Sequence, residues 1–235
     1  MTHLSVVIPV FNEENKISKD IEAVYKYFNE NSINGELIIV DDGSRDKTCD
    51  IAKSFSKHYP NLKVINYKNN RGKGYAVKIG MLAATKEYVL FADSGLCVPF
   101  KYANDGLKLL NEGYDIAIGS RRQNAKILLK QPLYRRLGSN VFDFLIKTFK
   151  IIPEGIEDTQ CGFKLFKKEI AHKLFKKIFT DKFMWDIELL RIVNKEKYKI
   201  GIFGVEWSND PDTRFNPIAG SFENLLQIAK IIVRT

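Results

Sequence analysis

The sequence predicts an α/β fold, a single domain with a mostly parallel central sheet and helices on both faces. Short apolar runs rich in β-branched residues, such as Ser5–Val10, are typical of buried parallel strands. These runs alternate with longer segments whose apolar residues recur at helical spacing. Repeated β–α units of this length indicate parallel strands joined by right-handed crossovers.

The expected elements follow one another without an internal repeat or a low-complexity linker. The predicted strands are the apolar runs Ser5–Val10, Glu36–Val40, Leu62–Asn66, Tyr88–Ala92 and Asp115–Gly119. The predicted helices between them are Ile17–Asn31, Thr48–His58, Gly74–Ala84 and Ala103–Asn111. In the first helix Ile17, Ile21, Val24 and Phe28 are three or four residues apart, which places them on one face.

Beyond residue 122 the chain becomes basic and aromatic. Ala125–Ile152 holds six basic residues against one acid, and the apolar residues of Phe142–Phe149 recur at helical spacing. This pattern fits either a core helix with a solvated basic rim or a helix that lies on an anionic membrane. The six lysines of Lys164–Lys177 favour the membrane interpretation. The segment from Ser221 to Thr235 predicts an amphipathic helix.

The composition limits the class of partner. Lys and Arg number 37 against 28 Asp and Glu, a formal net charge of +9, which favours anionic ligands or an acidic surface. No nucleic-acid-binding motif accompanies this charge, so we expect no nucleic acid. Three widely spaced cysteines, Cys49, Cys97 and Cys161, predict neither a disulfide framework nor a zinc site. No apolar run approaches the roughly 20 residues that a membrane-spanning helix needs.

Polar residues follow several predicted strands at the point where each strand ends. Asp41 and Asp42 end the second strand in LIIVDDGSRDKT, and Asp93 ends the fourth in FADSG. Because the carboxyl ends of parallel strands meet at one edge of the sheet, we expect these carboxylates around one pocket. There they can accept hydrogen bonds from a base or a ribose hydroxyl.

Cations are expected at the same edge. GSRR ends the fifth strand with Arg121 and Arg122, whose guanidinium groups suit bidentate contact with phosphate. The loop NRGKG places Arg71 and Lys73 before a helix, although its spacing is not that of a P-loop. Acids for a base and ribose, together with cations for a pyrophosphate, predict a nucleoside-diphosphate ligand.

The order of these motifs carries a family resemblance. VVIPVFNEE, IIVDDGSRDKT, NRGKG, FADSG and GSRR are followed by DTQCGFKLF at Asp158–Phe166 and FMWDIELL at Phe183–Leu190. In these motifs the chain resembles inverting family 2 glycosyltransferases of the GT-A fold, a Rossmann-like nucleotide-diphospho-sugar transferase fold. Within that family it is similar to the dolichyl-phosphate β-glucosyltransferases and other polyprenyl-phosphate glycosyltransferases. DTQCGFKLF is the most specific of the motifs, and the resemblance covers about residues 4–225.

The resemblance implies that the two halves of the single domain 1–235 have different functions. Residues 1–122 would bind the nucleotide-sugar, and residues 123–235 would face the acceptor and the membrane. The implied catalytic residues are Asp93, Asp186 and Arg121. The implied nucleotide-sugar contacts are Pro9, Phe11, Glu13, Asp41, Asp42, Lys73, Asp93, Arg122 and Arg214. The implied contacts to the acceptor phosphate are Arg135, Ser139 and Gln160.

The resemblance also implies a divalent metal, Mg²⁺ or Mn²⁺. Asp93 matches the first acid of the family's DxD metal motif, whereas Gly95 stands in place of the second acid. Divalent ions prefer several oxygen ligands. We therefore expect metal binding at Asp93 to depend on the diphosphate of the donor.

The implied activity is inverting transfer of a hexose, glucose from UDP-glucose, to dolichyl or polyprenyl phosphate by a peripheral enzyme at the cytoplasmic face of a membrane. A lipid monophosphate, with a second pKa near 6, is a nucleophile that needs no general base. One alternative acceptor is a saccharide hydroxyl, for which Asp186 would be the base. Mannose from GDP-mannose is a further alternative, and so is a non-catalytic nucleotide- or membrane-binding module, because Gly95 removes one metal carboxylate.

Overall fold

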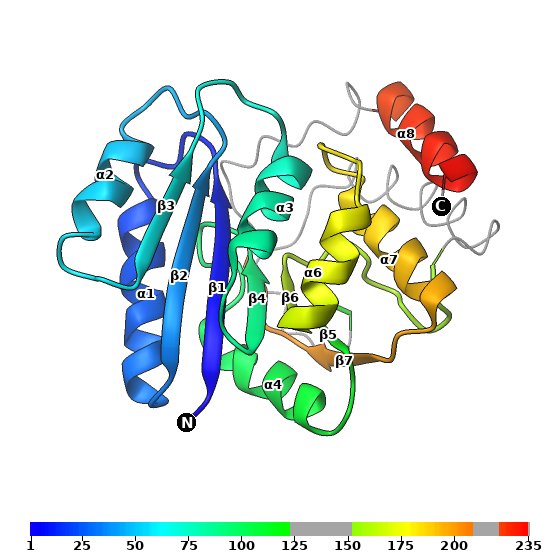
Figure 1. The fold of residues 1–235 in the computed structure, drawn as a ribbon, viewed down its shortest axis with the longest axis horizontal. Helices are drawn as coiled ribbons and strands as arrows, with labels where there is room; N and C mark the ends of the chain where they lie inside the picture. The colour runs from blue at the N-terminus through cyan, green and yellow to red at the C-terminus, as the bar shows by residue number, and fades with distance from the viewer. Residues whose placement is uncertain (123–151, 209–220, 235) are drawn as a thin grey trace.

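The computed structural model describes residues 1–122, 152–208 and 221–234 (Figure 1). The strands are β1 (His3–Val10), β2 (Asn34–Asp41), β3 (Leu62–Asn66), β4 (Tyr88–Ala92), β5 (Ile116–Ser120), β6 (Phe163–Lys167) and β7 (Ile200–Gly204). The α-helices are α1 (Ile17–Glu30), α2 (Thr48–Phe55), α3 (Lys73–Ala83), α4 (Ala103–Asn111), α6 (Lys168–Lys177), α7 (Trp185–Glu196) and α8 (Ser221–Arg234). A short 3₁₀ helix, η1, covers Phe100–Tyr102. The interpretations of Ala125–Ile152 fall almost wholly outside the described residues.

The seven strands of the described residues form one sheet in the order β3-β2-β1-β4-β6-β5-β7. Neighbouring strands are parallel except for β6, which runs antiparallel to both β4 and β5. The prediction of a mostly parallel sheet is therefore confirmed. The five predicted strands are all present, with ends that differ from the predicted bounds by no more than two residues.

Helices cover both faces of the sheet, as predicted (Figure 1). Successive residues of β1 point to opposite sides, so that Val6 and Ile8 join one hydrophobic core while Val7 joins the other. The first core is completed by α1, α2 and α4, and the second by α3, α6, α7 and α8. This two-sided burial explains why the strands read as continuous apolar runs.

Helix α3 lies very close to the sheet at Gly80. A Cβ on Gly80 would come within 2.4 Å of Cγ1 of Val7 in β1 and 2.9 Å of Cγ2 of Val40 in β2. The absence of a side chain therefore lets the helix axis approach the strands. Because α3 begins at Lys73, this contact fixes the direction in which the helix presents its first residue at the carboxyl ends of β1 and β4.

The insertion of β6 between β4 and β5 was not predicted. Lys164 of β6 lies opposite Phe91 of β4 and Ile118 of β5, and its side chain has no exposed surface. The prediction that all six lysines of Lys164–Lys177 add to a basic surface is therefore wrong for Lys164. Within the described residues, no helix is both long and apolar enough to cross a membrane.

Candidate functional site

The carboxyl end of β4 carries an ion pair between Asp93 and Lys73. Lys73 Nζ lies 2.6 Å from Asp93 Oδ1, and both side chains are about 30% exposed (30% and 29%). Burial lowers the pKa of Lys73, but the neighbouring carboxylate outweighs it and raises the pKa above its usual value. The structure thus joins the NRGKG loop to the FADSG turn through one charged contact.

A second ion pair joins the end of β5 to the segment before β6. Arg121 donates from Nε to Asp158 Oδ2 at 2.8 Å and from Nη2 to Oδ1 at 2.6 Å. Its backbone N–H also donates to Oδ2 at 2.8 Å. Burial raises the pKa of Asp158, but the bonds and charge of Arg121 lower it below its usual range. This bidentate geometry orients the guanidinium group, which lies 5.3 Å from the centre of the Trp207 ring.

A third ion pair lies deeper, between β6 and α7. Lys164 Nζ donates to Asp186 Oδ1 at 2.6 Å and to the carbonyl oxygen of Cys161 at 2.7 Å. Lys164 is fully buried and Asp186 is 6% exposed. Burial raises the pKa of Asp186, although the charges of Lys164 and Lys73 act in the opposite direction. Asp186 is therefore the counter-ion of a buried lysine.

The motif DTQCGFKLF contacts the residues of all three ion pairs. Asp158 binds Arg121, and Lys164 binds Asp186, while Gly162 lies directly against Asp93. A Cβ on Gly162 would come within 2.0 Å of Asp93 Oδ2, and the Asp93 backbone N–H donates to the Gly162 carbonyl at 2.9 Å. No side chain fits between this segment and Asp93.

Two other residues of this motif, Cys161 and Gln160, differ in their exposure to solvent. Cys161 is fully buried, and burial raises the pKa of its thiol to about 12, so this side chain packs in the core as a thiol. Gln160, a predicted acceptor contact, is partly exposed in the same segment. The structure therefore places Gln160 two residues from the Asp158–Arg121 pair.

The segments after β1 and β2 are bound to each other. The backbone N–H of Asn12 donates to Ser44 Oγ at 2.8 Å, and that of Glu13 donates to Thr48 Oγ1 at 2.7 Å. Of the residues predicted to line a nucleotide pocket here, Pro9 is buried in β1, while Phe11 and Glu13 are partly exposed. The structure thus brings together the two motifs that the sequence placed at one edge.

Asp41 and Asp42 have different environments. The Asp42 carboxylate accepts hydrogen bonds from the Tyr67 hydroxyl at 2.9 Å, the backbone N–H of Arg71 at 2.8 Å and that of Gly72 at 2.9 Å. Asp42 therefore holds the NRGKG loop, and its predicted contact with the nucleotide-sugar stays a prediction. Asp41 is also buried, and burial raises the pKa of its carboxyl group.

A buried acid in α1, Asp20, holds the turn that carries Asp93. Ser94 Oγ donates to Asp20 Oδ2 at 2.6 Å, and the Gly95 backbone N–H donates to Oδ1 at 3.0 Å. Gly95 has a φ of 88°, in the left-handed region that favours glycine. Sequence reasoning missed Asp20, because a single acid in an amphipathic helix ordinarily faces solvent.

Few of the described side chains are placed to bind a divalent metal ion. Among the described residues, no group of three or more His, Cys, Asp or Glu side chains could hold a metal ion. Asp93 fits as one carboxylate ligand, since it is partly exposed. The remaining ligands would be diphosphate oxygens and water, which Mg²⁺ commonly retains. A metal at Asp93 would also have to share this carboxylate with Lys73.

The other predicted site residues are less defined. Arg122 follows Arg121 with an exposed side chain, and its backbone N–H donates to Ser120 Oγ at 3.2 Å. Arg135, Ser139 and Arg214 lie outside the described residues.

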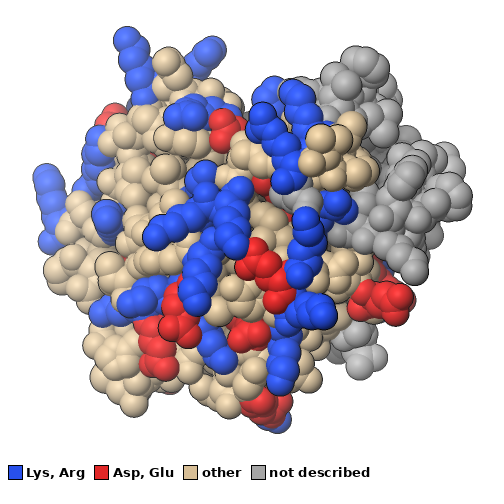
Figure 2. Space-filling view, turned by 45° about the vertical axis from the view of Figure 1, so that its right-hand side comes forward, with Lys and Arg blue, Asp and Glu red and all other residues tan. Residues whose placement is uncertain are grey.

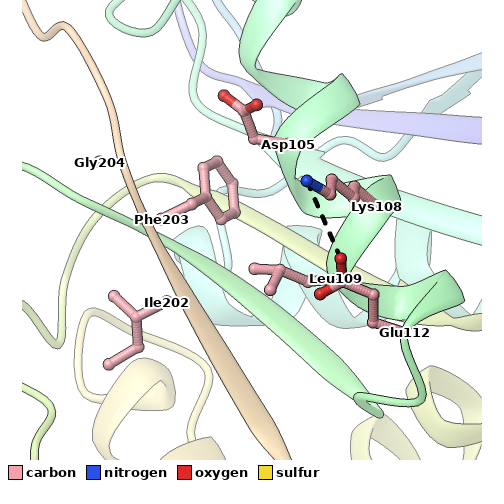
Figure 3. Close-up of a pocket in the computed structure, with 7 residues that line it drawn as sticks. All are labelled: Asp105, Lys108, Leu109, Glu112, Ile202, Phe203 and Gly204. Carbon is pink, nitrogen blue, oxygen red and sulfur yellow. Dashed lines mark ion pairs between the residues drawn. The ribbon is translucent and has the colours of Figure 1, made fainter.

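A surface hollow of about 280 Å³ lies between α4 and β7 (Figure 3). Figure 3 shows Phe203 directed toward α4, beside an ion pair of 3.9 Å between Lys108 and Glu112. None of the residues that line this hollow is a predicted site residue. The charged cluster at the strand ends, and not this hollow, is therefore the candidate functional site.

Comparison with known proteins agrees with the motifs. The family model described as "Glycosyl transferase family 2" matches residues 5–175. A dolichyl-phosphate beta-glucosyltransferase of Dictyostelium discoideum is 32% identical over an alignment of 245 positions, which covers 99% of this chain and 73% of the relative. The protein of that name in Homo sapiens is 32% identical over 97% of this chain and 72% of its own length.

Solved structures with low sequence identity share the fold. Glucosyl-3-phosphoglycerate synthase from Mycobacterium tuberculosis, in complex with Mn²⁺ and UDP-glucose, matches with a TM-score of 0.72 and 18% identity. The match covers 99% of this chain and 79% of that chain. The expected GT-A architecture is thereby confirmed.

Asp20 predicts a specific pH dependence of stability. Burial raises its pKa from 3.8 to about 6, so the folded state retains a proton that the unfolded state loses between about pH 4 and 6. The free energy of unfolding should therefore fall as pH rises through this window, by about 3 kcal/mol from this group. In urea unfolding at several pH values, Asp20→Asn should remove this fall.

The exposed Asp105 of α4 provides a matched control. Asp105→Asn should leave the slope between pH 4 and 6 as it is in the unmodified protein. An equal slope in the unmodified protein and Asp20→Asn would contradict the assignment.

Proposed function

Because the chain belongs to glycosyl transferase family 2, we propose that it transfers glucose from UDP-glucose to a dolichyl or polyprenyl phosphate, with inversion at the anomeric carbon. Two features support this choice. Relatives named dolichyl-phosphate beta-glucosyltransferase match nearly the whole chain at 32% identity. The motif DTQCGFKLF, the most specific part of the resemblance, forms the centre of the charged site.

The observation that carries the acceptor assignment is the state of Asp186. Its Oδ1 accepts a hydrogen bond from the buried Lys164, and only 6% of the residue is exposed. A general base must reach the proton that it removes, and a hydroxyl acceptor requires such a base. A phosphate acceptor does not require one, since it is largely ionised at neutral pH. Asp186 as a counter-ion therefore supports a phosphate acceptor over a saccharide hydroxyl.

The proposed reaction is a direct displacement. A phosphate oxygen of the lipid attacks C1 of glucose from the face opposite the diphosphate, and the C1–O bond to UDP breaks with its electron pair leaving on UDP. Lys73 and Arg121, with Arg122, would stabilise the negative charge that develops on the departing diphosphate. No proton is transferred in this step, so the site needs oriented cations and no free base.

The remaining predicted contacts keep these proposed roles. Pro9, Phe11, Glu13, Asp41 and Asp42 would line the uridine pocket, with Arg214 beside the diphosphate. Gln160, together with Arg135 and Ser139, would bind the acceptor phosphate.

Asp93 is the proposed protein ligand of Mg²⁺ or Mn²⁺. When bound, the ion would neutralise part of the charge on the diphosphate. Lys73 contributes a positive charge at the same carboxylate, 2.6 Å from Asp93 Oδ1. Lys73 would thus add positive charge beside the diphosphate, while it competes with the ion for the Asp93 carboxylate.

The membrane contact is proposed from surface charge. Figure 2 shows Lys and Arg side chains gathered over one face of the molecule, with Asp and Glu among them. Helix α6 contributes the exposed Lys173, Lys176 and Lys177. Basic residues are attracted to the anionic lipids of the cytoplasmic leaflet. We place the protein as a peripheral enzyme on that face of a membrane, where its lipid acceptor would lie.

The proposed function is tested with labelled donors. UDP-glucose and GDP-mannose are supplied separately with a polyprenyl phosphate in detergent, each with and without EDTA, and the chloroform-extractable label is counted. Label from UDP-glucose alone is expected, with a reduced rate in EDTA. Label from GDP-mannose alone would change the donor assignment, and the absence of lipid product despite UDP binding would exclude the acceptor.

A single variant and a double variant together test the role of Asp186. Asp186→Asn leaves the buried Lys164 without its counter-ion and should lower the free energy of unfolding by about 3 kcal/mol. The double variant Asp186→Asn/Lys164→Met removes both charges and should recover most of that loss in urea unfolding. Glucose transfer by the double variant should fall by no more than about tenfold.

A general base would give a different outcome. Loss of a base typically lowers the rate by about 10²–10⁴-fold, whether or not Lys164 is also replaced. A loss of this size in the stable double variant would contradict the phosphate-acceptor assignment.

A further inference from the structure

The two glycines of the NRGKG loop face another part of the chain. A Cβ on Gly72 would lie 2.6 Å from the carbonyl oxygen of Asp181, and one on Gly74 would lie 2.5 Å from that of Thr180. Both glycines therefore make room for residues 178–182, which we call the strap. The strap connects α6 to the turn before α7 and lies directly on the loop that presents Lys73.

Several polar contacts join the strap to this loop and to α3. The Tyr75 backbone N–H donates to the Asp181 carbonyl at 2.9 Å. Arg71 Nη2 lies 3.5 Å from Asp181 Oδ2. Lys78 Nζ donates to the Ile178 carbonyl at 2.5 Å. A displacement of the strap would therefore also displace the first turn of α3.

The strap is held by a buried carboxylate, Glu188 of α7. Glu188 has no exposed surface, and its Oε1 and Oε2 accept the backbone N–H groups of Phe179 at 3.0 Å and Thr180 at 2.9 Å. Burying a carboxylate is costly unless it is hydrogen-bonded, so these two bonds fix the strap strongly. Neither bond involves a residue of the three ion pairs.

From these contacts we infer that Glu188 is a positioning residue for Lys73. The loop lies between two buried carboxylates: Asp42 binds its N–H groups at Arg71 and Gly72, and Glu188 fixes the strap against Gly72 and Gly74. Among the described residues, the hydrogen bonds of the Glu188 carboxylate go to the strap and not to a residue of the three ion pairs. Its effect on the donor diphosphate passes through the strap, and this inference rests on the proposed function.

The inference is tested by UDP binding to the purified full chain, measured calorimetrically for the unmodified protein and for Glu188→Gln. Glutamine retains one acceptor but presents an NH₂ group to the other strap N–H. The dissociation constant for UDP should rise by about tenfold or more, and KM for UDP-glucose should rise with it. KM for the lipid phosphate should change by less than about twofold, because the acceptor is not bound by Lys73.

Glu36→Gln is the matched control. Glu36 also accepts a backbone N–H, from Thr85 at 2.6 Å, and a hydroxyl, from Ser5 at 2.6 Å, but it lies near the amino ends of β1 and β4. The Glu36→Gln variant should have a lower free energy of unfolding than the unmodified protein but the same affinity for UDP. Equal UDP affinities of Glu188→Gln and Glu36→Gln would overturn the inference, since a structural role alone would give that result.

Gly74→Ala tests the same contact from the side of the loop. Its methyl group would meet the Thr180 carbonyl and should weaken UDP binding even if Glu188→Gln fails to fold. Normal UDP affinity in folded Gly74→Ala would overturn the inference and leave the proposed function intact. Failure of the unmodified protein to bind UDP would overturn both.

Discussion

The antiparallel insertion of β6 between β4 and β5 is the constraint on which the site depends. It reverses the chain so that the segment before β6 lies at the carboxyl ends of β4 and β5, against Asp93 and Arg121. The seven residues 158–164, which include the start of β6, supply Asp158 to Arg121, a gap at Gly162 for Asp93, and Lys164 to Asp186. A purely parallel sheet would require a separate crossover to bring each partner to this edge.

The paired charges explain how so many ionisable groups can lie together in a partly buried site. Each acid of the three ion pairs has its own cation, within hydrogen-bond distance, so burial of the group carries little net charge. A diphosphate that enters would compete with Asp93 and Asp158 for the cations already held there. Orientation of the cations before the donor binds is the form of electrostatic stabilisation that such a displacement needs.

The sequence predicted the sheet well wherever local pattern determines structure, as in the apolar run of β1. It failed at β6, whose FKLFK pattern resembles a basic surface, because the partner of Lys164 lies 22 residues away. Asp20 and Glu188 were missed for the same reason: each is one of three acids in its helix, and only tertiary contacts show that it binds backbone N–H groups. The sequence shows the two glycines of NRGKG but does not show why they are needed, since the strap that they face is remote in sequence.

The most direct measurement is glucose transfer by Gly162→Ala, compared with Gly106→Ala. The first variant places a methyl group 2.0 Å from Asp93 Oδ2, while the control places one against the Leu165 side chain of β6, away from Asp93. Because small displacements of reacting groups cost about 100-fold in rate, Gly162→Ala should lose transfer by roughly that factor while remaining folded. Gly106→Ala should retain most of its activity. Full transfer by folded Gly162→Ala would contradict the account.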